Sequence, residues 1–183
     1  MGIAVFFVIV LLVSINALYV AAEFAAVGAR RGRIRQLADE GGRAAARLWT
    51  YLESPQRLDR YIAACQVGIT ISSLVLGAFG QAMLPPLIAP AFEQLGGMQE
   101  VAAQSVSAVV VLLGLTAFQM VLGELVPKSM ALQFPTETAL RTVGPMRWSL
   151  RVLSGFITVL NGSGNLILRL FRVPQVGHHH IHS

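Results

Sequence analysis

The sequence is poor in charged residues, which make up 13% of its 183 residues, whereas hydrophobic residues make up 55%. A water-soluble domain with so little charge would be difficult to keep in solution, so the composition predicts an integral membrane protein. Cysteine is almost lacking as well. Cys65 stands alone in an apolar segment, which excludes an internal disulfide and favours a packing role. The basic residues are not interleaved with aromatics, so no nucleic acid partner is expected.

Long apolar runs dominate what is present. A bilayer core of about 30 Å is crossed by roughly 20 apolar residues in a helix, and residues 3–27, 61–88 and 101–126 meet this requirement. A fourth candidate, Trp148 to Phe171, carries polar residues along one side and three glycines. That pattern favours a helix lying in the membrane interface over one that crosses the membrane. The predicted fold class is therefore an all-α membrane protein with three transmembrane helices.

The basic residues predict how these spans are oriented. Of the fourteen lysines and arginines, eight fall between Arg30 and Arg60 and six from Lys128 onward, while the connection from Gln81 to Glu100 has none. Basic residues are enriched on the cytoplasmic side of a membrane. Three spans then place the N-terminus outside and the C-terminus in the cytoplasm, as expected for a multi-pass protein of the cell inner (plasma) membrane.

The segments outside the spans are amphipathic. Residues 30–53 predict two short juxtamembrane helices separated at Gly41 and Gly42, and residues 136–172 predict a further helical region. We expect these helices to rest on the inner leaflet, where arginine and lysine favour anionic headgroups. The transmembrane domain then covers residues 1–172. The remaining residues, 173–183, are interpreted as a linker, since Ile181 interrupts the histidines and a purification tag fits poorly.

Glu124, in the stretch "VLGELVPKSM", is the main candidate for a functional residue. A carboxylate inside a bilayer costs about 2.5 to 3.5 kcal/mol, so it usually faces a partner or a watery cavity. One interpretation is an ion pair with Lys128, four residues on. The alternative starts from Pro127, which is predicted to break the third helix and lacks the N–H that would bond the carbonyl of Gly123. A free carbonyl beside a carboxylate resembles the broken helices that transporters use for cations.

The other two spans offer further oxygen atoms. On the second span Thr70 and Ser73 belong to a narrow polar stripe, and Asn16 lies deep in the first span. Such residues also serve ordinary helix packing. Together with Glu124 and the Gly123 carbonyl they form a set of hard oxygen donors, without histidine or cysteine, that favours magnesium, calcium or an alkali cation.

Three stretches carry a resemblance to a known family. The segments "INALYVAAEFAAVGARRGRIRQLADEG", "CQVGITISSLVLGAFG" and "VLGELVPKSMALQFP" resemble the transmembrane domain of the CorC/CNNM magnesium transporters, sometimes labelled hemolysin-C-like. The resemblance covers nearly the whole chain. It implies a homodimer of three-span protomers with a belt of juxtamembrane helices and a Mg²⁺ site in a cavity open to the cytoplasm. It also implies a following pair of cytoplasmic CBS domains that bind ATP.

The resemblance also assigns residues. Glu124 matches the central acidic ligand of the family, whereas Asn16 falls where many members have serine, and Ser73 and Thr70 fall where many have asparagine. Val20 replaces a second serine common in the first span. All of these except Val20 still offer oxygen, so a site could persist with altered geometry.

The leading functional hypothesis is a Mg²⁺ transporter that exports Mg²⁺ from the cytoplasm through Glu124, Asn16, Ser73, Thr70 and the Gly123 carbonyl. Exchange for Na⁺ is implied by the resemblance only. The alternative is a membrane-anchored module that senses Mg²⁺ or holds cytoplasmic domains without moving the ion itself. An enzyme is not expected, because the sequence shows no nucleophile and base pair, phosphate loop or metal-hydrolase motif.

Overall fold

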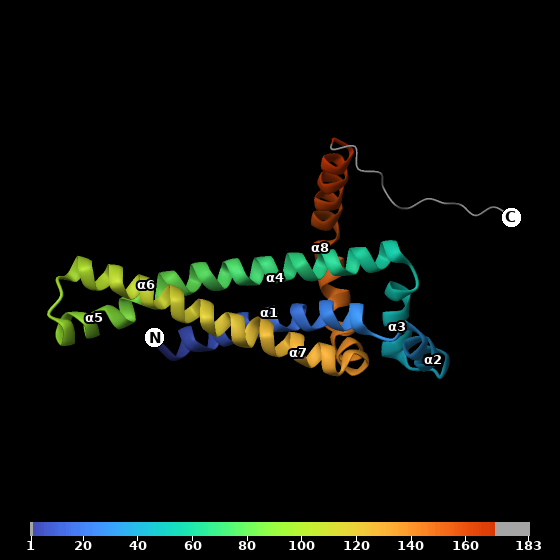
Figure 1. Cartoon of the computed structure of the whole chain (residues 1–183), viewed down its shortest axis with the longest axis horizontal. Helices are drawn as coiled ribbons and strands as arrows, with labels where there is room; N and C mark the ends of the chain where they lie inside the picture. The colour runs from blue at the N-terminus through green and yellow to red at the C-terminus, as the bar shows by residue number, and fades with distance from the viewer. Residues whose placement is uncertain (1, 171–183) are drawn as a thin grey trace.

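The computed structural model describes residues 2–170, with side chains for all of them except Leu95 and residues 160–161 and 164–170. Every regular element in that part is helical (Figure 1), which confirms the all-α prediction. The predicted linker, residues 173–183, lies outside the described residues. In chain order the elements are α1 (Gly2–Gly28), α2 (Arg31–Asp39), α3 (Arg43–Leu52), α4 (Pro55–Met83), α5 (Pro85–Gly96), α6 (Glu100–Gln119), the π-helical turn η1 (Met120–Leu125), α7 (Val126–Gln133) and α8 (Pro135–Leu170).

Three helical segments form a bundle along the long axis of the molecule (Figure 1): α1, α4, and the continuous run of α6, η1 and α7. By length and composition, the described part of the chain holds three helices able to cross a membrane. They are Gly2–Gly28, Pro55–Gln94 and Glu100–Gln133. The predicted number of spans is therefore confirmed.

A seam of small and branched residues joins α1 to α4. From Val5 to Val20 the buried residues of α1 recur at steps of three and four, which places them on one face of the helix. From Gly68 to Gly80 the buried residues of α4 recur at steps of four. Polar side chains occur within this apolar seam on both helices. The seam residues used below are Val13, Asn16 and Val20 on α1, and Gly68, Ser72 and Leu76 on α4.

The second candidate span, Pro55–Gln94, includes the predicted residues 61–88 but contains a helix boundary that was not predicted. Helix α4 ends at Met83, and Pro85 begins α5. Proline lacks the N–H needed to continue an α-helical ladder, but it is well suited to the first turn of a new helix. Helix α5 packs against α6 at the far end of the bundle, and Gly97 adopts a left-handed conformation (φ 59°) in the connection between them.

The third span differs from the prediction at Pro127. The helix does not break there: it widens into the π-helical turn η1 and continues as α7 to Gln133. The proline ring would clash with the carbonyl four residues earlier in a regular α-helix. The wider turn, in which Val126 N–H bonds the carbonyl of Val121, accommodates the proline without ending the helix.

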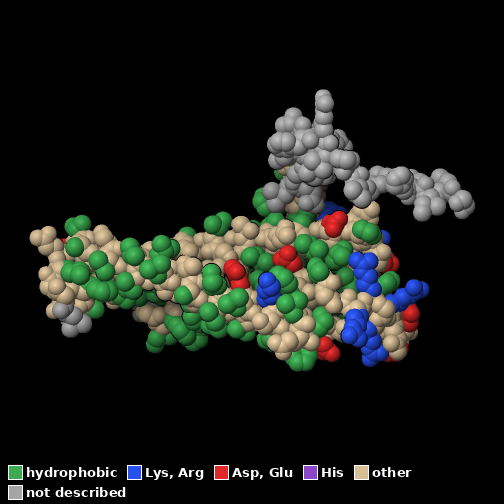
Figure 2. Space-filling model, in the orientation of Figure 1, with side chains coloured by type: hydrophobic (Ala, Val, Ile, Leu, Met, Phe, Trp, Pro, Cys, Tyr) green, Lys and Arg blue, Asp and Glu red, His purple; other side chains and the backbone are tan. Residues whose placement is uncertain are grey.

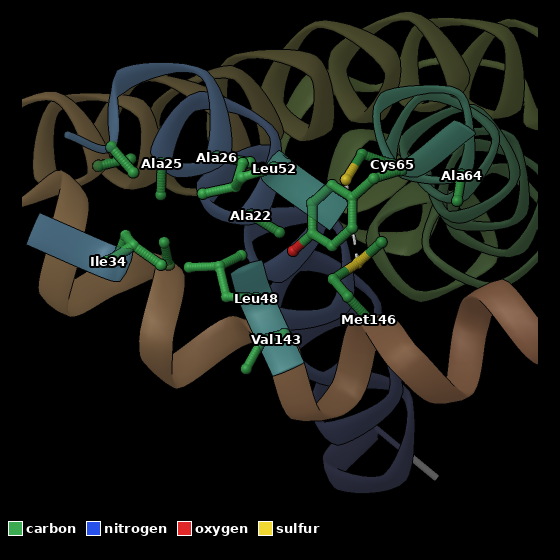
Figure 3. Packing of buried hydrophobic residues seen from close by; sticks show 14 of the residues in the cluster. Ala22, Ala25, Ala26, Ile34, Leu48, Leu52, Ala64, Cys65, Val143 and Met146 are labelled. Carbon is green, nitrogen blue, oxygen red and sulfur yellow. Dashed lines mark hydrogen bonds between the residues drawn. The ribbon is translucent and has the colours of Figure 1, made fainter. Parts of the chain in front are cut away.

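The other end of the bundle is capped by α2, α3 and α8. Lysines, arginines and acidic residues gather at this end in Figure 2, whereas hydrophobic side chains cover much of the other half of the visible face. Buried side chains from α1, α2, α3, α4 and α8 form one hydrophobic cluster here (Figure 3). Cys65 is fully buried in it, with its Sγ 3.9 Å from the sulfur of Met146, in agreement with its predicted packing role.

Helix α8 is one element of 36 residues, in the region 136–172 for which the sequence predicted juxtamembrane helical structure. It runs across the bundle instead of along it (Figure 1), and it is not among the three candidate spans of the described chain. Its contact with α1 includes a hydrogen bond of 2.9 Å between the hydroxyls of Tyr19 and Ser149. The cap is thereby attached to the bundle near the middle of the α1–α4 seam.

Candidate functional site

A buried asparagine connects the three spanning segments. Asn16 is fully buried on α1. Its Oδ1 lies 2.9 Å from the hydroxyl of Ser72 and 3.1 Å from that of Ser73, both on α4. Its Nδ2 donates to the backbone carbonyl of Gly123 in η1 at 3.1 Å. One amide thus holds together helices that the sequence places far apart.

A glutamine extends this arrangement. The Nε2 of Gln119, the last residue of α6, donates to the Ser73 hydroxyl at 2.6 Å. The Ser73 hydroxyl in turn donates a hydrogen bond to Asn16 Oδ1 at 3.1 Å. The result is a chain of hydrogen bonds that runs from α6 through α4 and α1 to η1. We call this set the polar cluster: Asn16, Ser72, Ser73, Gln119 and the carbonyl of Gly123.

The close approach of α1 to η1 depends on Gly123. This residue is buried, and a Cβ at its position would lie 3.0 Å from Asn16 Nδ2. That distance is tighter than ordinary carbon–nitrogen contacts, so any side chain would push the amide away. The carbonyl of Gly123 cannot accept the usual α-helical hydrogen bond, because residue 127 is a proline and has no N–H. The sequence prediction of a carbonyl released from the helix is therefore compatible with the structure, which shows it bonded to Asn16.

The hydroxyl of Ser72 has more acceptors within reach than it has protons. Besides Asn16 Oδ1, its Oγ lies 2.7 Å from the carbonyl of Gly68 and 3.1 Å from that of Ile69. A serine hydroxyl donates one hydrogen bond at a time. When the proton points to Gly68, the oxygens of Ser72 and Asn16 face each other with lone pairs only, 2.9 Å apart. Such a pair of oxygens can serve a donor or a hard cation.

Glu124 follows Gly123 in the sequence but takes no part in the hydrogen bonds of the cluster. Its side chain is exposed on the surface of the single chain, while the neighbouring Gly123 is buried. In the part of the chain that the structure describes, Glu124 and Lys128 do not form the ion pair that was one interpretation of the sequence. Instead the Lys128 ammonium lies 4.6 Å from the centre of the Phe24 ring on α1, a cation–π contact.

Thr70 does not join the polar cluster. It is exposed, and its hydroxyl donates to the carbonyl of Gln66 on its own helix at 2.9 Å. Gln66 in turn lies near Glu23, with 3.5 Å between its Nε2 and the Glu23 Oε1. The polar stripe expected along α4 is therefore split. Ser73 faces the cluster, while Gln66 and Thr70 line a separate groove beside α8.

Two members of the cluster, Ser72 and Gln119, were not among the predicted site residues. Ser72 could have been found from its spacing, because Gly68 and Leu76 lie four residues before and after it on the same face of α4. Gln119 could have been found as an uncharged polar residue in the middle of an apolar span, since such residues face a protein neighbour or a cavity.

The chemistry of the cluster is that of neutral oxygen donors. Among the described residues no three histidine, cysteine, aspartate or glutamate side chains come together. Amide, hydroxyl and carbonyl oxygens are ligands for hard cations such as magnesium and calcium, and softer metals prefer sulfur or imidazole. Glu124 is the carboxylate adjacent in sequence to this set.

Comparison with known proteins identifies the family. Residues 7–183 match the model of the cyclin M transmembrane N-terminal domain, CNNM. The chain is 36% identical over 168 residues to the UPF0053 protein YhdT and 34% identical over 173 residues to the UPF0053 protein YugS, both from Bacillus subtilis. It is 27% identical over 170 residues to the polyamine export protein of Salmonella typhimurium.

These alignments cover 92%, 94% and 93% of this chain but 36%, 39% and 37% of the respective relatives. The chain thus spans less than half the length of the proteins that it matches. The match to the family model extends over nearly the whole chain and agrees with the three apolar helices of the fold. The chain is a multi-pass membrane protein and belongs to the family of the cyclin M transmembrane N-terminal domain.

Proposed function

We propose that this chain is the membrane domain of a transporter that exports Mg²⁺ from the cytoplasm, with Na⁺ exchange as the driving force. The observation that carries the proposal is the polar cluster itself. Three otherwise apolar helices contribute oxygen donors at one point, next to a carboxylate and at a π-helical turn. Buried polar groups inside a membrane are costly, and they usually mark the path of an ion or substrate.

The proposed ligands follow from the geometry. Asn16, Ser73 and the Gly123 carbonyl are kept from the sequence prediction, with Glu124 as the charged group. Ser72 takes the place of Thr70, because Ser72 contacts Asn16 and Thr70 does not. Since Asn16 Nδ2 donates to the Gly123 carbonyl, a cation could use that carbonyl only after this hydrogen bond opens. Ion binding would therefore loosen the contact between α1 and η1.

The orientation and assembly are part of the proposal. The charged end of the molecule, capped by α2, α3 and α8 (Figure 2), would face the cytoplasm, in line with the positive-inside rule. Glu124 is exposed among apolar side chains. This arrangement favours a homodimer in which the partner or a watery cavity covers this surface. In longer family members, cytoplasmic CBS domains would follow α8.

A second candidate function has an observation in its favour. The polar groups of the cluster already satisfy one another by hydrogen bonds, so the cluster is stable without a moving ion. That is compatible with a membrane module that senses Mg²⁺, or that holds cytoplasmic domains, while another protein transports the ion.

Flux through reconstituted vesicles separates these functions. The purified chain is placed in liposomes that contain a Mg²⁺-sensitive dye, with and without a Na⁺ gradient, and Mg²⁺ binding is measured in parallel by calorimetry. Transport predicts Mg²⁺ flux that is lost in Glu124→Ala and retained in Glu100→Ala, which removes an exposed carboxylate at the other end of the same span. Binding without flux supports the sensor, and the absence of both refutes a Mg²⁺ site.

Spermidine is tested as a second cargo, because the Salmonella relative is named as a polyamine exporter.

A further inference from the structure

A pocket at the charged end of the molecule carries an inference beyond ion transport. It has a volume of about 460 Å³ and lies where α2, the end of α7 and the start of α8 meet. Two arginines, Arg30 and Arg33, line it from the α2 side, while Thr136 and Glu137 line it from α8. Unlike the grooves along the spans, which are lined mainly by apolar side chains, this pocket combines charges of both signs.

The charged groups around the pocket are not paired with one another. In the described part of the chain the one ion pair within 4.0 Å joins Arg57 and Glu53, so neither Arg30 nor Arg33 forms one with Glu137. Arg33 uses one guanidinium nitrogen for the amide oxygen of Gln36 at 3.0 Å, which leaves its other N–H groups available. The pocket therefore presents two guanidinium groups and a carboxylate that are not paired with one another. Such a pocket suits a ligand that carries both a negative and a positive charge.

The location of the pocket identifies what kind of ligand reaches it. Helix α1 ends at Gly28 and the third spanning segment ends at Gln133, so the pocket lies at the level where two spans leave the hydrocarbon core. Beside it, Leu132 and Phe134 are 57% and 58% exposed. A ligand with a charged head and an apolar tail could place its head in the pocket and its tail along these side chains. That is the geometry of a phospholipid at the membrane interface.

We propose that this pocket binds the headgroup of phosphatidylethanolamine. Arg30 and Arg33 would hold the phosphate, for which the guanidinium fork is well matched, and Glu137 would accept hydrogen bonds from the ammonium two carbons away. Phosphatidylglycerol would satisfy the arginines with its phosphate, but its headgroup glycerol is uncharged and would offer the Glu137 carboxylate only neutral hydroxyl donors, which bind a carboxylate more weakly than an ammonium does. A choline headgroup would bring a positive charge without N–H donors. The proposal does not depend on which ion the membrane domain moves.

Lipid retention by the purified protein tests this site. The chain is reconstituted in nanodiscs with equal amounts of phosphatidylethanolamine and phosphatidylglycerol, released, and analysed by native mass spectrometry. We expect the unmodified protein to retain phosphatidylethanolamine preferentially and the variant Arg30→Gln/Arg33→Gln to retain it about tenfold more weakly, since charge-assisted hydrogen bonds are lost. Arg31→Gln, an exposed arginine of the same helix outside the pocket, is the matched control and should bind normally.

Glu137→Gln provides the sharper test, because it should change selectivity instead of abolishing binding. Without the carboxylate, phosphatidylglycerol should become equal to or better than phosphatidylethanolamine, and phosphatidylcholine should bind weakly in both proteins. The proposal is overturned if the unmodified chain prefers phosphatidylglycerol, if Glu137→Gln leaves the preference unchanged, or if Arg31→Gln loses as much lipid as the double variant. Circular dichroism and size-exclusion profiles of each variant identify any loss that comes from misfolding.

Discussion

Replacing Asn16 by leucine tests whether the polar cluster holds the three spans together. Leucine has the same four side-chain heavy atoms branched at Cγ as asparagine, so the substitution keeps the shape of the side chain but removes every hydrogen bond that the amide makes. Two acceptor contacts on the α4 side and one donor contact to η1 would be lost. The hydroxyl of Ser72 can turn to the carbonyl of Gly68, while the carbonyl of Gly123 loses its donor.

The expected loss follows from the value of hydrogen bonds between membrane helices, which average about 0.6 kcal/mol each and reach about 1.7 kcal/mol. Three such bonds give about 2 kcal/mol. The buried Gly123 carbonyl left without its donor adds to this, because unsatisfied buried groups cost about 1 to 3 kcal/mol. The free energy of unfolding should therefore fall by about 3 to 5 kcal/mol in Asn16→Leu.

Unfolding by sodium dodecyl sulfate in mixed micelles, followed by circular dichroism, measures this difference. Ser14→Ala is the matched control. Ser14 lies on the same helix, is exposed, and donates only to the carbonyl of Val10 four residues earlier, so its removal should change stability by less than about 0.5 kcal/mol. If Asn16→Leu is as stable as this control, the hydrogen bonds of the cluster do not contribute to helix association and the reasoning fails.

Three further substitutions test the packing around the site by the same assay. Gly68→Ala should cost about 1 to 3 kcal/mol through overpacking, since a Cβ there would lie 2.5 Å from the ring of Tyr19; a neutral result would mean that the ring moves freely. Phe24→Leu should lower the free energy of unfolding by about 0.5 to 2 kcal/mol, because it removes the cation–π contact with Lys128. Lys128→Met should then lower the free energy of unfolding less in the Phe24→Leu protein than in the unmodified protein. Leu48→Ala, in the fully buried position of α3, should cost about 2 to 5 kcal/mol, whereas a small effect would show that the cap is loosely packed.

The large features of the fold could be predicted from the sequence because they depend on hydropathy and spacing alone. Apolar runs of sufficient length predict spanning helices whatever their neighbours are, and the glycine pair at residues 41–42 predicted the interruption between α2 and α3. The boundary between α4 and α5 was not predicted, because the apolar run continues past Pro85 and proline chemistry, not hydropathy, sets this boundary.

The site was only partly predictable, because the sequence does not show how each helix is rotated about its own axis. Thr70 and Ser73 were placed on one stripe by their spacing, but a stripe does not show which side faces the neighbouring helix. The buried face of α4 runs through Gly68, Ser72 and Leu76, so Ser73 lies at its edge and Thr70 points away. The partner of Asn16 is 107 residues distant in η1, and no local pattern reveals such a contact.

The π-helical turn explains how one short segment serves two environments. Consecutive residues in η1 have opposite surroundings, because Gly123 is buried against Asn16 while Glu124 is exposed beside apolar neighbours such as Leu125, which is 53% exposed. In a membrane, an exposed carboxylate among apolar side chains cannot remain in contact with lipid without cost. Lys128 does not neutralise it, since its ammonium lies over Phe24. The carboxylate therefore requires water, a cation or a second protomer on that surface, and an ion pathway at this turn would supply the first two.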